Sequence, residues 1–129
     1  MSLPAEDVLA IQALVARYNF AVDGRDAAGF AGCFTDDGEF SFADNEYHGR
    51  DELMAFAKTL GGSGQMRHVV TSMLTDGDGP RATVRSYCHV TSTGDDGNPL
   101  VTVQGVYDDE VAHTDDGWLF TKRRFVSDA

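Results

Sequence analysis

Apolar positions at the start of the chain recur at the spacing of a helix. They are Val8, Ile11, Leu14, Val15, Tyr18 and Val22. This spacing places them on one face and predicts an amphipathic helix over residues 4–22 that ends at Asp23-Gly24. Asp26 is a suitable N-cap for a second, short helix that runs through Phe34.

The next segment predicts short strands and one more helix. Thr35–Gly38 is typical of a turn, and residues 39–42 alternate like a strand. Tyr47–Gly49 predicts a short strand that leads into a third helix over about 50–60. That helix is expected to stop at Gly61-Gly62, because glycine favours the end of a helix.

From residue 66 the pattern changes to the period of two that is typical of strands. The predicted strands cover 66–74, 81–92, 100–111 and 118–126, and the turns between them cover 76–79, 94–98 and 114–117. Short turns between long strands predict an antiparallel meander.

Helices therefore come first and a long-stranded sheet comes last, an order that predicts one α+β domain over residues 1–129. We expect a curved antiparallel sheet wrapped around the N-terminal helices. A cone of this kind encloses an interior pocket at its wide end, apolar with a few polar groups.

Composition narrows the possible partners. The chain has 129 residues, 42% of them hydrophobic and 24% charged, which are ordinary values for a globular protein. The net charge of −11 disfavours nucleic acid and anionic membranes as partners. The N-terminus shows neither a secretory signal nor a membrane span, so a cytoplasmic location is expected.

The cysteines and common motifs exclude several classes of chemistry. Cys33 and Cys88 lie in apolar stretches with no metal-binding spacing, and we expect two small buried side chains without a disulfide. Phosphate-loop, dinucleotide-binding and serine-nucleophile motifs are absent from the sequence, and no metal site is expected.

Tyr18, Asp23 and His68 are the candidates for acid–base chemistry. Tyr18 lies on the apolar stripe of the first helix, so its buried hydroxyl needs a partner. Asp23 follows by five residues, about 140° of rotation, so the two side chains meet only if the last turn loosens. His68 begins the first long strand and shares a face with Val70. A carboxylate beside it would raise its basicity, whereas Asp23 in a solvated turn and His68 as a satisfied core residue remain the alternatives.

Arg123 and Arg124 are candidates for substrate binding. They point to opposite faces of the last strand, so only one can face the pocket. Either could bind an anionic group or pair with an aspartate. The remaining histidines, His48, His89 and His113, are expected at the surface.

Several short motifs, taken in order, resemble the SnoaL-like branch of the nuclear transport factor 2-like (cystatin-like) superfamily along nearly the whole chain. They are residues 11–18 with Asp23, Cys33–Gly38, Tyr47–Leu53, Met66–His68, Gly105–Asp109 and Asp116–Phe120. The resemblance implies a cone formed by a curved sheet around the first helix, in a homodimer or higher homo-oligomer.

The resemblance also implies a site. In related enzymes such as scytalone dehydratase, bile-acid 7α-dehydratase and lindane dehydrochlorinase, an Asp–His pair acts as the base. Asp23 and His68 match that pair, and Tyr18 matches the helix tyrosine of the bile-acid enzyme. Where that enzyme has a further carboxylate this chain has Val90, and its late arginine falls at Ser127.

The first functional hypothesis is a lyase or isomerase of the dehydratase type that acts on a small apolar or polycyclic substrate without a metal or organic cofactor. His68, held by Asp23, would remove a proton beside a carbonyl, and Tyr18 would donate to the oxygen. The alternatives are a non-catalytic small-molecule-binding module, or an accessory subunit like the small subunit of ring-hydroxylating dioxygenases.

Overall fold

The computed structural model describes residues 2–60, 62 and 64–129, so Met1, Gly61 and Ser63 lie outside it. The predicted end of the third helix at Gly61-Gly62 therefore falls partly outside the described residues. The chain begins with two helices, α1 (Ala5–Asp23) and α2 (Ala27–Ala31). The third helix, α3 (Gly49–Ala57), follows the first two strands. None of the described helices is long and apolar enough to cross a membrane.

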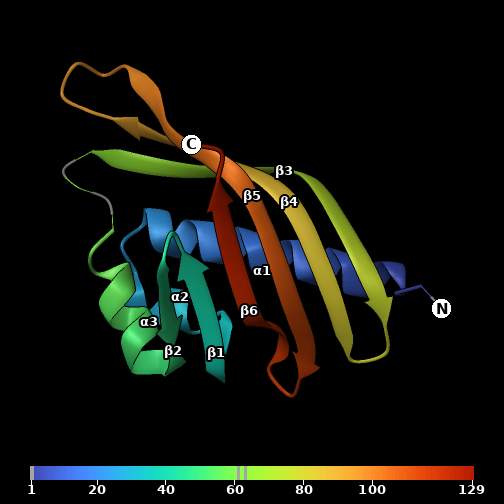
Figure 1. The fold of residues 1–129 in the computed structure, drawn as a ribbon. Coiled ribbons are helices and arrows are strands. Elements are labelled where there is room, and N and C mark those ends of the chain that lie inside the picture. The colour runs from blue at the N-terminus through green and yellow to red at the C-terminus, as the bar shows by residue number, and fades with distance from the viewer. Residues whose placement is uncertain (1, 61, 63) are drawn as a thin grey trace.

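Six strands form one sheet in the order β2-β1-β6-β5-β4-β3. Their bounds are β1 Phe34–Phe42, β2 Asn45–His48, β3 Gln65–Asp78, β4 Arg81–Thr93, β5 Pro99–Thr114 and β6 Gly117–Ser127. Neighbours pair antiparallel except β1 and β6, which are parallel. The sheet is strongly curved, and α1 lies across its concave face while α2 and α3 gather at the β1–β2 end (Figure 1). The predicted α+β class and the curved sheet wrapped around the N-terminal helices are confirmed, but the sheet is not wholly antiparallel as predicted, because β1 and β6 pair in parallel.

The core lies between α1 and the inner face of the sheet. The buried residues of α1 are Ile11, Leu14, Val15, Tyr18, Ala21 and Val22, which repeat the helical spacing of the sequence. In β4 every second residue from Ala82 to Val90 is buried, as the alternation predicted. Cys33 and Cys88 are buried free thiols, also as predicted.

Four local predictions were wrong. The second helix ends at Ala31 rather than Phe34, because Phe34 already pairs with Phe120 of β6. Residues 35–38 do not form a separate turn. They belong to β1, where the register jumps between Phe34 and Glu39 and the intervening residues bulge out of the ladder.

The other two corrections concern element ends. The third helix covers Gly49–Ala57 instead of 50–60. The turn predicted at 76–79 is shorter, because Asp76, Gly77 and Asp78 still pair with β4. The long β3 strand is thereby extended well past the predicted end at Leu74.

Candidate active site

Asp23 and His68 meet at the point where α1 ends and β3 begins. Oδ1 of Asp23 lies 2.7 Å from Nδ1 of His68, and Oδ2 accepts a hydrogen bond of 2.9 Å from the His68 backbone N–H. Both side chains are largely buried, with 9% of Asp23 and 11% of His68 exposed. When Nδ1 carries the proton and donates to Asp23, Nε2 keeps its lone pair. Among the described residues no hydrogen bond engages Nε2.

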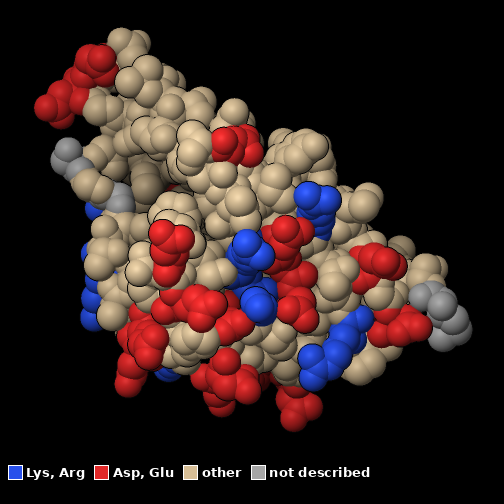
Figure 2. Space-filling model, in the orientation of Figure 1, with Lys and Arg blue, Asp and Glu red and all other residues tan. Residues whose placement is uncertain are grey.

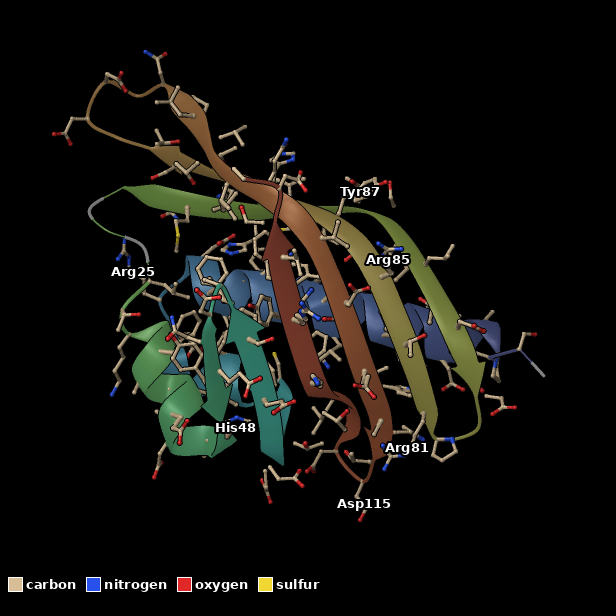
Figure 3. The ribbon with its side chains drawn as sticks, viewed as in Figure 1. Arg25, His48, Arg81, Arg85, Tyr87 and Asp115 are labelled. Carbon is tan, nitrogen blue, oxygen red and sulfur yellow. The ribbon has the colours of Figure 1, made fainter. Side chains whose placement is uncertain are left out.

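Two further side chains tie the same helix end to the start of β3. The Gln65 amide Nε2 donates to the backbone oxygen of Asp23 at 3.1 Å. Arg25 donates through Nη2 to the backbone oxygens of Gly62 and Gly64 at 2.8 and 2.9 Å. Arg25 lies just past the end of α1, beside this loop (Figure 3). The position of the carboxylate relative to β3 is therefore fixed by backbone as well as side-chain contacts.

Tyr18 joins the site through His68 and not through Asp23. Its ring meets the imidazole edge to face, with ring centroids 6.4 Å apart. The helix stays regular to Asp23, so the five-residue offset keeps tyrosine and carboxylate on different sides of α1. The His68 imidazole contacts both side chains, because its Nδ1 faces the Asp23 carboxylate and its ring lies beside the Tyr18 ring.

A small cavity of about 140 Å³ opens beside these residues. Its wall consists of Tyr18, Phe40, Phe42, Phe56, Leu60, Met66, His68, Val90, Thr102, Val103, Tyr107 and Phe125. Half of these side chains are aromatic, and His68 is the one wall residue that can carry a positive charge near neutral pH. The cavity therefore suits an uncharged, mostly apolar molecule with few polar groups.

Tyr107 is a wall residue that the sequence reasoning missed. It is 2% exposed, and its hydroxyl lies within hydrogen-bonding reach of the Tyr18 hydroxyl. Burial, followed by the negative charge that Tyr18 can carry, raises the pKa of Tyr107 well above its usual range. The strand alternation could have found it, because Tyr107 shares the inner face of β5 with Gly105, Asp109 and Val111.

Arg123 lies behind the cavity wall and not in it. Its side chain is fully buried, and its guanidinium carbon lies 3.4 Å from the ring centre of Tyr107, 4.2 Å from that of Tyr18 and 4.5 Å from that of Phe120. Arg124 is exposed on the opposite face of β6. Neither predicted substrate-binding arginine therefore lines the cavity, although Arg123 contacts two residues that do.

Asp109 is the charged partner of Arg123. Nε of Arg123 lies 3.1 Å from Oδ1 of Asp109, but the N–H group does not point along that line, so the contact is an ion pair without an aligned hydrogen bond. Burial raises the pKa of Asp109 to about 7 against the opposing pull of Arg123. Burial lowers the pKa of Arg123, but Asp109 and the two tyrosines more than offset this, so the guanidinium stays charged.

Two surface features lie away from this cavity. A wider groove of about 1050 Å³ runs between the first half of α1 and the β5–β6 turn, where Trp118 Nε1 donates to Asp7 at 3.1 Å. It is larger than the cavity, but the described residues that line it include no hydrogen-bonded acid–base pair. On the β1–β2 hairpin, His48 contacts Glu39 at 2.9 Å and Glu46 at 3.3 Å. His48 is exposed there, well away from the end of α1 (Figure 3).

Comparison with known proteins identifies relatives of the chain. The model of the SnoaL-like domain matches residues 4–124. Rv3472 from Mycobacterium tuberculosis, a protein of unknown function, is 35% identical with a TM-score of 0.91, covering 97% of this chain and 78% of its own. ActVI-ORFA from Streptomyces coelicolor is 25% identical with a TM-score of 0.86, covering 94% and 96%.

A more distant structure shows the same fold. A protein of Novosphingobium aromaticivorans with the provisional name scytalone dehydratase is 23% identical, with a TM-score of 0.82, and the match covers 95% of this chain and 84% of that one. No protein with a curated function matches the chain.

Proposed function

Because the chain belongs to the family of SnoaL-like domains, we propose that it is a cofactor-independent lyase or isomerase of the dehydratase type. One observation carries the proposal: a largely buried carboxylate holds Nδ1 of His68 at 2.7 Å, and His68 forms part of the wall of an apolar cavity. A carboxylate in this position orients the imidazole and stabilises the positive charge that forms when Nε2 takes up a proton from the substrate.

In the proposed reaction, Nε2 of His68 removes a proton from a carbon beside a carbonyl group. The C–H electrons form the enolate, and the Tyr18 hydroxyl donates a hydrogen bond to the oxygen that gains charge. In an isomerisation the imidazolium returns the proton to another carbon. In a dehydration the enolate electrons expel a β-hydroxyl group, which leaves as water with the proton from the imidazolium.

Hydrogen–deuterium exchange tests this role without knowledge of the natural substrate. Small cyclic ketones such as cyclohexanone and 2-cyclohexenone are incubated with the protein in D₂O, and loss of the α-proton signal is followed by NMR. We expect exchange above the buffer rate, and a loss of at least ~10²-fold in His68→Gln, the usual contribution of a positioned base. His89→Gln is the matched control, because His89 lies on the outer face of β4.

The same experiment separates the alternative. If the ketones bind but exchange no faster than in buffer, the chain is a small-molecule-binding module and the catalytic proposal fails. Equal exchange by the wild type and His68→Gln would remove His68 from the mechanism.

We also propose that two copies of the chain pair through the outer face of the sheet. Large apolar side chains are exposed there on four strands, namely Val69, Leu74, Tyr87, Val101 and Val126, with exposed fractions between 38% and 72%. Exposed apolar side chains spread over one sheet face are typical of an interaction surface. Acidic residues gather along the lower edge of this view, and its upper part carries few charges (Figure 2).

A further inference from the structure

The buried Arg123 guanidinium has a feature that the acid–base proposal does not use. Its side chain is fully buried, yet none of its three nitrogens has an aligned hydrogen bond among the described residues. A buried cation normally has its N–H groups satisfied, because desolvation of an unpaired charge costs several kcal/mol. Here the guanidinium lies against aromatic rings instead.

The two closest rings belong to Tyr18 and Tyr107, whose hydroxyls interact with each other. Arg123 lies 3.4 Å from the Tyr107 ring centre and 4.2 Å from that of Tyr18, and both tyrosines form part of the cavity wall. A cation on the face of a phenol ring favours negative charge on the phenol and strengthens its hydroxyl as a donor. The positive charge therefore acts on the cavity through the rings, without contact between Arg123 and a ligand.

The cavity limits what can receive these hydrogen bonds. At about 140 Å³ it is close to an apolar cavity of about 150 Å³ that holds a benzene-sized ring. The aromatic wall suits a flat ring, and among the described residues neither tyrosine hydroxyl has a hydrogen bond to a carbonyl or carboxylate oxygen. A single oxygen on a six-membered ring would supply such an acceptor.

We propose that Tyr18 and Tyr107, with Arg123 behind them, form an anion-binding subsite that takes the oxygen of a monocyclic phenol, enol or enolate. Arg123 is a positioning residue here, since it acts through the two tyrosine rings. This inference rests on the proposed function, because only that function makes a monocyclic ketone the substrate. Binding of a phenol to the subsite can be measured without turnover.

Other ionisable groups near the two tyrosines could also affect the ionisation of a bound phenol. Asp109 pairs with Arg123, Cys88 lies beside Tyr107, and His68 with Asp23 lies beside Tyr18. Burial is the largest influence on the Tyr18 hydroxyl and raises its pKa, whereas Arg123 lowers it, by more than Asp109 raises it. His68 could itself accept a proton from a bound phenol, so the measurement is made in the His68→Gln background as well.

The test measures the ionisation of bound 4-nitrophenol by the visible absorption of its anion. We expect the pKa of the bound phenol to fall by about one unit or more, equivalent to at least tenfold tighter binding of the anion. The shift should persist in His68→Gln, shrink in Tyr107→Phe, and disappear in Arg123→Met. If Arg123→Met does not fold, the test uses the smaller shift expected in Tyr107→Phe and the loss of the shift expected in the double variant Arg123→Met/Asp109→Leu.

Three outcomes would overturn the inference. One is a bound phenol that ionises at the same pH as free phenol or at a higher pH. Another is a shift in the wild type that vanishes in His68→Gln. The third is 2-naphthol binding as tightly as phenol, which would refute the limit to one ring. If the protein lowers the pKa of bound phenol but does not accelerate ketone exchange, only the catalytic proposal fails. If it accelerates ketone exchange but does not lower the pKa of bound phenol, only the proposed subsite fails.

Discussion

Asp23 holds His68 through both of its carboxylate oxygens, one on the imidazole Nδ1 and the other on the backbone N–H. The ring hydrogen bond fixes the tautomer, and the backbone hydrogen bond fixes the strand from which the ring projects. The position and the tautomer of the imidazole therefore depend on one side chain.

This double contact makes Asp23→Asn informative. Asparagine has the shape of aspartate but only one acceptor oxygen for the two N–H groups of His68. Its NH₂ group therefore faces one of these N–H groups, and two donors meet without an acceptor. We expect ketone exchange to fall at least ~10²-fold, and the free energy of unfolding to fall by about 1–3 kcal/mol for the unsatisfied donor. NMR exchange and urea unfolding measure the two effects. An unchanged exchange rate would show that the carboxylate does not support the base.

Asp109→Asn tests the titration of a buried acid. The pKa of Asp109 is about 7 in the folded protein and 3.8 without the fold, so the folded state binds the extra proton between these values. The stability from this group is complete below pH 3.8 and is lost as pH rises through 7. From pH 5 to pH 8, the unfolding free energy of Asp109→Asn relative to the wild type should rise by roughly 2–4 kcal/mol, at 1.36 kcal/mol per pKa unit. A difference that does not change with pH would contradict the raised pKa.

The buried ion pair predicts a strongly non-additive double mutant. Arg123→Met leaves Asp109 without its partner in the core and should cost about 3–5 kcal/mol near pH 8. Arg123→Met/Asp109→Leu removes both charges and should recover most of that loss. Arg124→Met, on the exposed face of the same strand, is the control and should change stability by less than about 0.5 kcal/mol. Additive losses in urea unfolding would argue against coupling.

Gly105 allows β5 and β6 to approach closely at the cavity end of the sheet. A Cβ at this position would overlap the backbone oxygen of Val126 and lie 2.9 Å from the Phe125 ring. Gly105→Ala should lower the free energy of unfolding by roughly 2–4 kcal/mol, because backbone must move to admit the methyl group. Gly94→Ala is the matched control, since nothing lies within 4 Å of its Cβ position. Equal thermal midpoints for the two variants would contradict this reading.

Tyr87→Glu tests the proposed pairing of two chains. Tyr87 is 60% exposed on the outer face of β4, next to Arg85 along the strand (Figure 3). A carboxylate at this position would be buried in the interface, and the neighbouring Arg85 is already paired with Asp108 at 3.4 Å, so the variant should be monomeric where the wild type is dimeric. Light scattering after gel filtration measures the mass. A monomeric wild type would remove the basis of the proposal.

Much of this arrangement could be predicted from the sequence because its periodicities are unbroken. The helical stripe of α1 and the alternation of β4 specify which residues face the core, and both are confirmed. The contact between Asp23 and His68 was also expected, but on the resemblance, since a spacing of 45 residues says nothing about distance in space. Its catalytic role remains a prediction.

What could not be predicted depends on packing between elements. Alternation places Arg123 and Arg124 on opposite faces but does not say which face is inside, and a fully buried arginine is unusual enough that the exposed side is the default. The β1–β6 pairing was missed for a similar reason. Residues 35–38 have the composition of a turn, and only the neighbouring β6 strand holds their ends in the sheet.

The parallel pairing of β1 with β6 also bears on how the protein is made. The strand that carries Arg123 must dock beside a strand synthesised about eighty residues earlier, so the cavity floor cannot be completed on the ribosome until Gly117–Ser127 has emerged. Until then the nascent chain exposes the inner edges of β1 and β5. Contacts this distant in sequence are slow to form, which makes this stage of biosynthesis the one most in need of chaperone protection.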